Sequence, residues 1–324
     1  MKLSLRPHIA PLARTFAISR GAKTQARTVI VELHHSGYTG RGQCVPYPRY
    51  NESVESVLAE IEASRRDIEA GIDLSGLQAL MPAGAARCAV DCALWDLKAK
   101  QTGTPVWELA DLPAPEPFET AVTVSLDTPE QMGVAASQIT GNLLKLKLGG
   151  HDDIARLEAV HAARAKARLI IDGNEGLVPA DFPAFAEKAA ACGVVLIEQP
   201  FPDGDDSALE SIDTPLRVCA DESAHTSSDI PALAKRYDAV NVKLDKTGGF
   251  TEALKMIKAA RAHDMQVMTG CMVAGSLSMA PASLLAGLAD FVDLDGPLWL
   301  AEDIADGLTY KDGFVSPPSR ALWG

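Results

Sequence analysis

The chain has 324 residues, of which 47% are hydrophobic and 23% charged, enough for one large domain or two with an ample core. Its formal net charge of −13 argues against nonspecific binding to nucleic acid or to anionic membranes. The six cysteines form no C-x-x-C pair, so we expect neither a zinc site nor a disulfide framework, as in a reducing cytosol. Because no apolar run resembles a signal peptide or a membrane span, we expect a cytoplasmic protein.

The first third of the chain predicts a small α+β unit. Two strands are expected within residues 1–35, and a turn follows at 36–37. Apolar residues at helical spacing then predict helices over 53–68 and 85–100. Closely spaced prolines within 113–117 mark the boundary of this unit.

From residue 118 onward, short β-branched runs alternate with amphipathic helical runs. The expected strands end near Ser125, Lys147, Asp172, Glu198, Asp221, Lys243, Gly270 and Asp293. The last seven ends are 22 to 27 residues apart by their numbers, the length of one strand plus one helix. Eight such units predict an α/β fold with a closed barrel, whose active site lies at the carboxyl ends of the strands. A doubly wound sheet is the alternative, but no G-x-G-x-x-G or Walker sequence follows any strand.

Charged residues gather at these strand ends. Lys145 and Lys147 alternate with leucines and share one face of the second strand, where repulsion would lower the pKa of at least one. Asp172, Glu198 and Asp221 end the next three strands and would repel one another without a cation between them. Three oxygen ligands with room for water and substrate are typical of Mg²⁺. The simpler interpretations are solvated lysines on a surface strand and three separate salt bridges.

Lys243 ends the sixth strand, half a barrel circumference from the second. A substrate carboxylate on the metal would have Lys147 on one face of its α-carbon and Lys243 on the other. We therefore expect a 1,1-proton transfer: one lysine removes the α-proton, the metal stabilises the enediolate, and the other lysine returns a proton to the opposite face. Lys145 would help to hold the oxyanion.

Six residues carry a resemblance to a known family: Lys145, Lys147, Asp172, Glu198, Asp221 and Lys243. Their pattern resembles that of the enolase superfamily, specifically its muconate lactonizing enzyme-like subgroup, whose sites combine lysine bases with Mg²⁺. The resemblance covers essentially the whole chain. It implies a (β/α)7β TIM-like catalytic barrel over 116–303 and an α+β N-terminal capping domain over 1–115, joined by the C-terminal segment 304–324.

Asp293 and Asp295 indicate which reaction of the subgroup to expect. Two carboxylates at alternate positions of the eighth strand would attract the α-ammonium of a dipeptide and repel the anionic muconate and succinylbenzoate substrates; the alternative is solvation of a loop. The run DLDGPLWL at 293–300 resembles the dipeptide epimerase signature. Three further stretches resemble bacterial L-Ala-D/L-Glu epimerases: 19–27, 44–53 and 82–97.

The resemblance implies an isomerase, a Mg²⁺-dependent dipeptide epimerase that acts on the C-terminal residue of L-Ala-L/D-Glu in peptidoglycan peptide metabolism. Alternatives are epimerisation of other dipeptides, or a cycloisomerase or o-succinylbenzoate synthase of the same superfamily. A catalytically silent binding protein is a further alternative, against which the intact catalytic set argues. The expected partner is a small-molecule dipeptide, with no nucleic acid and no membrane, and a homo-oligomer stays open.

Side-chain specificity is expected to come from loops of the cap. Arg20 is the candidate to bind the glutamate γ-carboxylate, because a guanidinium can bind it with two hydrogen bonds. The alternatives are a solvated Arg20 or one of the other nearby cations: Arg14, Lys23 and Arg27. Tyr47 and Tyr50 either close over the substrate or pack against the cap.

Five other residues stand close to the expected site. Cys271 and Met272 either line the pocket or fill the top of the barrel. Gln199 and Glu222 are expected to face away from the site, since each follows a ligand by one position. His151 follows its strand and is interpreted as a surface residue.

Overall fold

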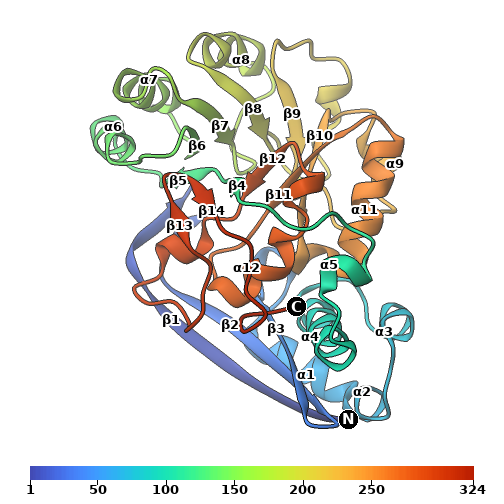
Figure 1. Ribbon diagram of the computed structural model, residues 1–324. Coiled ribbons are helices and arrows are strands. Elements are labelled where there is room, and N and C mark those ends of the chain that lie inside the picture. Colours follow the sequence, from blue (N-terminus) through green and yellow to red (C-terminus); the bar gives the residue numbers. More distant parts are fainter.

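The computed structural model describes residues 1–324, and Figure 1 shows its two parts one above the other. The lower part is a cap in which an antiparallel sheet packs against helices. The upper part is a ring of parallel strands with helices around it. None of the helices combines the length and the apolar character that a membrane span requires.

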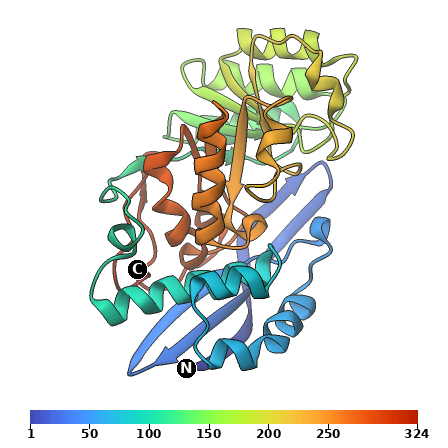
Figure 2. The same cartoon turned by 90° about the vertical axis from the view of Figure 1, so that its right-hand side faces the viewer.

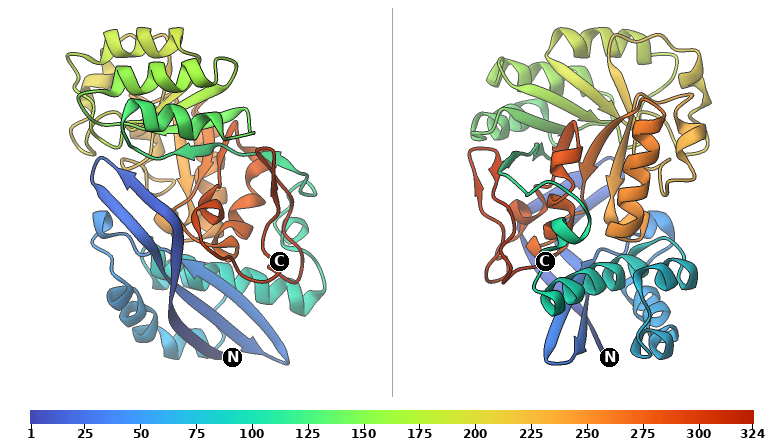
Figure 3. Two further views of the ribbon diagram at one scale, coloured as in Figure 1. Left: turned by 90° about the vertical axis from the view of Figure 1, so that its left-hand side faces the viewer. Right: turned by 45° about the vertical axis from the view of Figure 1, so that its right-hand side comes forward.

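The cap sheet contains three strands in the order β1 (Lys2–Ile18), β2 (Gly21–His35), β3 (Tyr38–Cys44). The long hairpin of β1 and β2 rises from the cap toward the barrel, as Figures 2 and 3 show. Two strands and the turn at 36–37 match the sequence expectation, whereas β3 was missed.

Glycines explain why β3 escaped detection. This strand, YTGRGQC, carries few β-branched residues because it packs directly on the backbone of α4 (Ala85–Thr102). A Cβ at Gly42 would lie 2.0 Å from the Ala89 carbonyl oxygen, and one at Gly40 would lie 2.2 Å from that of Ala93. Only glycine allows the two backbones to approach so closely.

The cap helices pack beside this sheet and cover one of its faces. They are α1 (Val54–Ala63), α2 (Arg65–Glu69), α3 (Leu74–Leu80) and α4, followed by the short α5 (Val106–Leu109). The single helix expected over 53–68 is divided at Ser64, whose backbone N–H is shared between the carbonyls of Glu60 and Ile61. Such sharing is common where the last turn of a helix tightens.

Eight parallel strands form the barrel, and each pairs with its neighbours in sequence. They are β5 (Val122–Val124), β6 (Leu143–Lys147), β7 (Arg168–Asp172), β8 (Val194–Glu198), β9 (Arg217–Ala220), β10 (Ala239–Lys243), β11 (Gln266–Gly270) and β12 (Phe291–Asp293). The first and last strands close the ring through a 2.7 Å hydrogen bond from the Ala121 N–H to the Val292 carbonyl. The predicted barrel with a strand-rich cap is therefore confirmed, and the sequential strand order excludes a doubly wound sheet.

Helices surround the barrel on its outer face. They are α6 (Pro129–Ser137), α7 (Asp153–Ala163), α8 (Phe182–Ala191), α9 (Ile230–Leu233), α11 (Phe250–Ala262) and α12 (Ser276–Ser283). The regular alternation fails after β8, where only the 3₁₀ turn η2 (Ser207–Glu210) precedes β9. The intervening sequence QPFPDGDD is too rich in Pro, Gly and Asp to form a helix.

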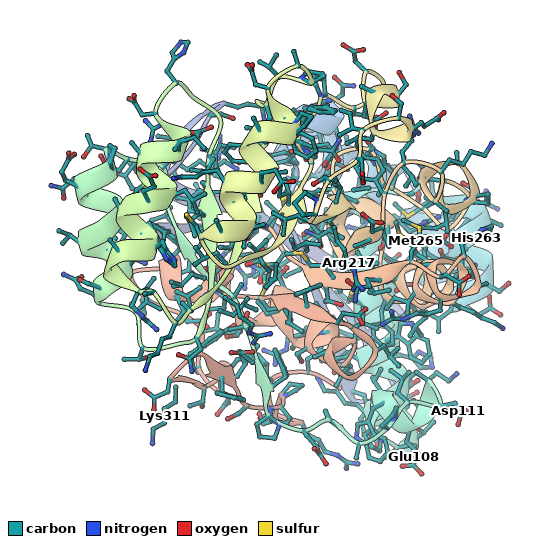
Figure 4. All side chains as sticks on the ribbon, turned by 90° about the horizontal axis from the view of Figure 1, so that it is seen from above. Glu108, Asp111, Arg217, His263, Met265 and Lys311 are labelled. Carbon is teal, nitrogen blue, oxygen red and sulfur yellow. The ribbon has the colours of Figure 1, made fainter.

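The interior of the barrel changes character along the strands. Between the starts and the middles of the strands, seven buried apolar residues form a floor: Ala121, Leu143, Ile170, Leu196, Cys219, Ala239 and Met268. On β6, Leu143 belongs to this floor, and Lys145 and Lys147 follow on the same inward face, while Leu144 and Leu146 pack outward in the main core. The strands end toward the cap, because residues at their carboxyl ends line one cavity together with cap residues. Figure 4 shows the molecule from above with all side chains drawn.

The C-terminal segment contacts both parts of the molecule. Its strands β13 (Tyr310–Lys311) and β14 (Phe314–Val315) pair with β4 (Phe118–Glu119) beside the barrel. The last residues then pack on α4, where the Trp323 indole donates to the Cys92 carbonyl. Figures 2 and 3 show the C-terminus beside this helix.

Candidate active site

A cavity of about 450 Å³ lies between the cap and the carboxyl ends of the barrel strands. The cap lines it with Phe16, Ile18, Arg20, Gly21, Ala22, Lys23, Tyr47, Pro48, Arg49 and Tyr50. The barrel lines it with Thr123, Lys147, Asn174, Asp221, Glu222, Lys243, Cys271, Met272, Val273, Asp293, Asp295 and Gly296. Its size is in the range of pockets that enclose a small molecule.

Three carboxylates meet beside this cavity, and one of them, Asp221, lines it. Asp172 and Glu198 end β7 and β8, and Asp221 follows β9 directly. One oxygen from each lies within 4.8 Å of the other two, and all three side chains are buried. Register explains the meeting, because Asp172 pairs directly with Glu198 across the two strands.

This set of donors suits a hard divalent cation such as Mg²⁺. Three carboxylate oxygens from separate strands converge, and nothing other than oxygen is offered. Burial, together with neighbouring Asp172, raises the pKa of Glu198 to about 7. A cation bound among the three carboxylates would lower the pKa of Glu198 again and keep all three groups ionised.

The lysine at the centre of the charge network is Lys145, which is buried and does not line the cavity. Its Nζ lies 2.5 Å from Glu198 Oε2, 2.8 Å from Asp293 Oδ2 and 3.3 Å from Asp172 Oδ2. Although burial acts to lower it, these carboxylates hold the pKa of Lys145 well above its ordinary value. The sequence predicts a lowered pKa for at least one of the two lysines, but the pKa of Lys145 is raised.

Lys147 and Lys243 both reach the cavity from opposite sides of the barrel. Their strands, β6 and β10, are separated by β7, β8 and β9, which supply the three carboxylates. Lys147 Nζ lies 2.5 Å from Asp172 Oδ2, and Lys243 Nζ lies 2.6 Å from Asp221 Oδ2. Two amines therefore face one cavity across a common carboxylate cluster.

Two further residues hold Asp221 in place, and of these only Lys246 was not singled out from the sequence. Lys246 lies in the short α10 (Leu244–Thr247) and is buried. Its Nζ lies 2.6 Å from Oδ1 of Asp221 and also donates to the backbone carbonyl of Asp221. Gln199 accepts at Oε1 from the backbone N–H groups of Asp221 and Ser223. Its amide group therefore faces away from the carboxylates, as expected, yet it fixes the turn that carries Asp221.

Glu222, in contrast, does not face away. Strand β9 ends at Ala220, so the alternation of side chains no longer applies two residues later. The Glu222 carboxylate lines the cavity and lies 2.5 Å from Nη2 of Arg20. His151 is exposed, as expected.

Asp293 and Asp295 both line the cavity, but only Asp293 belongs to a strand. The expectation that both lie on the eighth strand is therefore wrong, because β12 ends at Asp293 and Asp295 begins the 3₁₀ turn η4 (Gly296–Trp299). Asp295 Oδ2 accepts from the Thr123 N–H at 2.7 Å. Burial and the adjacent Asp293 raise the pKa of Asp295 to about 6. One Asp293 oxygen, Oδ1, is buried without a hydrogen-bond partner.

The cations of the cap differ in how far they are neutralised. Arg20 lines the cavity, but Nη1 lies 2.9 Å from Glu175 Oε2 and Nη2 contacts Glu222. Lys23 also lines the cavity and forms no ion pair; its Nζ lies 4.8 Å from the centroid of the Tyr47 ring. Desolvation by the surrounding cavity walls, together with the positive charges of Lys147 and Arg20, lowers the pKa of Lys23 although its side chain is exposed.

The remaining candidates occupy other positions. Arg14 stacks over the ring of Trp299, and Arg27 is exposed beside Glu55. Tyr50 lines the cavity and packs edge-on against His225.

Comparison with known proteins adds a family context. The model of the mandelate racemase/muconate lactonizing enzyme N-terminal domain matches residues 3–110, and the enolase C-terminal domain-like model matches residues 127–321. The chain is 45% identical to an L-Ala-D/L-Glu epimerase of Escherichia coli (strain K12), over 94% of this chain and 95% of that protein. It is 43% identical to an N-acetyl-D-glutamate racemase of a Pseudoalteromonas species, over 91% and 95% respectively.

Solved structures show the same similarity. An enolase family member from Agrobacterium tumefaciens with homology to dipeptide epimerases was solved with sodium and L-Ala-L-Glu. It superposes with a TM-score of 0.98 at 47% identity, covering 99% of each chain. A dipeptide epimerase from Cytophaga hutchinsonii, solved with Mg and D-Ala-L-Val, has a TM-score of 0.90 at 27% identity, covering 98% of this chain and 92% of that one.

Proposed function

The chain belongs to the mandelate racemase/muconate lactonizing enzyme family of the enolase superfamily, and from this we propose that it is a Mg²⁺-dependent dipeptide epimerase acting on L-Ala-Glu. The observation that carries the proposal is the placement of Lys147 and Lys243 on opposite sides of the carboxylate cluster, in one cavity. Inversion at a carbon needs a base on one face and an acid on the other.

Asp172, Glu198 and Asp221 would hold the metal ion. When bound, Mg²⁺ supplies positive charge that stabilises the negative charge developing on the substrate carboxylate. Lys147, as the free amine, takes the α-proton from one face, and Lys243, as the ammonium, gives a proton to the other. The two lysines exchange roles for the opposite epimer, and solvent restores their protonation.

Lys145 would act without touching the α-proton. Its ammonium lies beneath the cavity among Asp172, Glu198 and Asp293. Because it is buried and paired with these acids, it remains charged at neutral pH. We assign to it the role of holding negative charge near the substrate carboxylate.

The two aspartates at the end of β12 would receive the substrate's α-ammonium. Asp293 and Asp295 both face the cavity, and Asp293 Oδ1 has no hydrogen-bond partner within the protein. A dipeptide ammonium would supply the missing donor for this buried oxygen.

For the glutamate side chain, Lys23 is a better candidate than Arg20. The Arg20 guanidinium is already balanced by Glu175 and Glu222, whereas the Lys23 ammonium lies at the cavity without a carboxylate. Lys23 is exposed at the cavity and has no carboxylate partner, so its charge is available to an anionic ligand. We therefore propose that Lys23 binds the γ-carboxylate and that Arg20 shapes the loop beside it.

The direct test follows the glutamate α-proton of L-Ala-L-Glu by NMR, with Mg²⁺ in D₂O. The proposal requires loss of this signal and formation of L-Ala-D-Glu. A persistent signal would reject the Ala-Glu assignment, and a dipeptide library in the same assay would then identify or exclude other dipeptides.

A second candidate is racemisation of N-acylated glutamate. Lys145 pairs with Asp293, so the net negative charge around the two aspartates is smaller than that of two free carboxylates. The site therefore demands a substrate ammonium less strongly than the sequence suggests, which would favour a neutral acylamino group relative to two free aspartates. The test measures kcat/KM for N-acetyl-D-glutamate and for L-Ala-L-Glu in the same D₂O assay. The substrate with the higher kcat/KM identifies the preferred activity.

The division of the chain and its setting are also proposals. We assign 1–115 and 304–324 to the capping domain and 116–303 to the catalytic barrel. Contacts of the last residues with α4 support the first assignment. We place the enzyme in the cytoplasm, in the metabolism of peptidoglycan peptides; fractionation of cells that express it tests the location.

A further inference from the structure

Both cap loops that line the cavity converge on one carboxylate of the barrel, Glu175. From the β1–β2 turn, Arg20 Nη1 approaches its Oε2 to 2.9 Å. From the loop at 47–50, Arg49 donates through Nη2 to Oε1 at 2.8 Å and through Nε to Oε2 at 3.1 Å. The Asp203 N–H donates to Oε1 at 2.8 Å, so three loops are joined at a single side chain.

Glu175 holds this place through an uncommon backbone conformation. Asn174 and Glu175 have φ values of 44° and 65°, in the left-handed region that residues with a side chain rarely occupy. Hydrogen bonds fix the turn, because the Glu175 N–H donates to the Gln199 carbonyl and the Asn174 N–H donates to Asp172 Oδ1. The Asn174 carbonyl in turn accepts from Arg20 at 2.8 Å. Strain of this kind persists where the surrounding structure enforces it, often beside functional sites.

We propose that Glu175 is a positioning residue that fastens both cap loops over the cavity. It is not among the residues that line the cavity, so it acts through Arg20 and Arg49 rather than on the substrate. The inference rests on the proposed function, since the loops would close over the dipeptide. Without the carboxylate, the two guanidinium groups would lose their shared partner and repel each other, and the closed arrangement would be populated less.

This role predicts a specific kinetic signature. When only part of the protein is closed, the apparent affinity for substrate falls in proportion to the closed fraction. Saturating substrate restores closure, so KM rises while kcat is preserved. A role in holding Asp172 through the turn would instead weaken metal binding.

The experiment compares E175Q, R49Q and the double variant with E158Q. Glu158 forms a 2.6 Å ion pair with Lys188 on the half-exposed surface of α7 and α8, so E158Q removes the same charge away from the cavity. Hydrogen–deuterium exchange without substrate reports the loops at 18–23 and 47–50. Steady-state kinetics with L-Ala-L-Glu reports KM and kcat, and thermal melting with and without Mg²⁺ reports metal binding.

In E175Q we expect faster exchange in both loops, KM raised by about tenfold and kcat within about twofold, with unchanged Mg²⁺-dependent stabilisation. R49Q should raise KM by a similar factor. The double variant should raise KM no further than either single variant does, because both substitutions remove the same contact. The proposal would be overturned if E175Q had the same loop exchange rates and the same KM as the wild type. It would also be overturned if E175Q lost its thermal stabilisation by Mg²⁺ while the loop exchange rates stayed unchanged. Because the exchange measurement needs no substrate, inactivity toward L-Ala-L-Glu would count against the proposed function alone.

Discussion

Lys246 Nζ donates to Asp221 twice, to the carboxylate oxygen Oδ1 at 2.6 Å and to the backbone carbonyl of the same residue. This buried lysine therefore fixes both the position and the charge of one proposed metal ligand. Groups that orient a ligand in this way affect metal affinity although they never touch the metal.

Replacing Lys246 with methionine should lower the apparent Mg²⁺ affinity by about 10–100-fold, because Asp221 loses the cation that orients it. Titration of activity and of thermal stabilisation with Mg²⁺ measures the change. Lys258→Met, at an exposed position of α11, is the matched control. An unchanged Mg²⁺ midpoint in Lys246→Met would show that the ligand is oriented without it.

Lys147→Ala and Lys243→Ala should each lower epimerisation by at least about 10²–10⁴-fold, because each removes one of two opposed proton-transfer groups. The remaining lysine still faces one side of the α-carbon. Each variant should therefore exchange the α-proton of one epimer with D₂O without inverting it, and the two variants should prefer opposite epimers. NMR in D₂O from each pure epimer measures this. Inversion by the double variant would contradict the two-base mechanism.

Lys23→Ala should raise KM for L-Ala-L-Glu by about tenfold or more and reduce the preference for L-Ala-L-Glu over L-Ala-L-Gln, because a charged hydrogen bond is lost. Arg20→Ala should instead raise KM for both dipeptides alike, since Arg20 is paired with Glu175 and Glu222. Arg27→Ala, at an exposed position, is the control. If Arg20→Ala alone changed the preference, the γ-carboxylate would belong to Arg20.

Asp245 should make stability depend on pH. Burial raises its pKa to about 7, although the Val45 N–H donates to its Oδ1 at 2.8 Å. A raised pKa means that the folded protein favours the neutral acid. The contribution to the free energy of unfolding is complete below about pH 4 and is lost as the pH rises through 7, by at most about 1.4 kcal/mol per pH unit. Asp245→Asn stays neutral, so its stability relative to the wild type should increase from pH 4 to 7. Urea unfolding across this range tests the sign, and a constant difference would refute it.

Gly42→Ala should destabilise the fold by about 3 kcal/mol, because its Cβ would lie 2.0 Å from the Ala89 carbonyl oxygen in α4. Urea unfolding measures the change. Gly287→Ala is the control, since a Cβ there meets no atom within 4 Å. Equal stability of the two variants would mean that β3 and α4 can separate without cost.

Much of the fold followed from one regularity of the sequence. Strand ends recur every 22 to 27 residues, and parallel strands of similar length bring their ends to one rim. The charged residues at those ends therefore meet in space, as Lys147, Asp172 and Glu198 do. Strand β3 was missed because its identity depends on Gly40 and Gly42 facing α4, a contact between segments far apart in the chain.

Other features of the site depend on neighbours that a linear pattern does not reveal. Lys145 has a raised pKa because acids from three other strands surround it, which two adjacent lysines on one strand do not suggest. Glu222 turns toward the cavity because β9 ends early. The position of Glu175 depends on the positive φ angles of Asn174 and Glu175, and the residue types at these two positions do not predict that backbone conformation.

The apolar floor of the barrel makes the cavity blind-ended. Leu143, Ile170, Met268 and their neighbours close the barrel below Lys145, so no second passage leads through the ring. Both epimers must therefore enter and leave on the cap side of the barrel, where the cavity lies. Outgoing product therefore competes with incoming substrate for one opening, and the mixture of epimers in solution, rather than any directional path through the protein, sets the net flux.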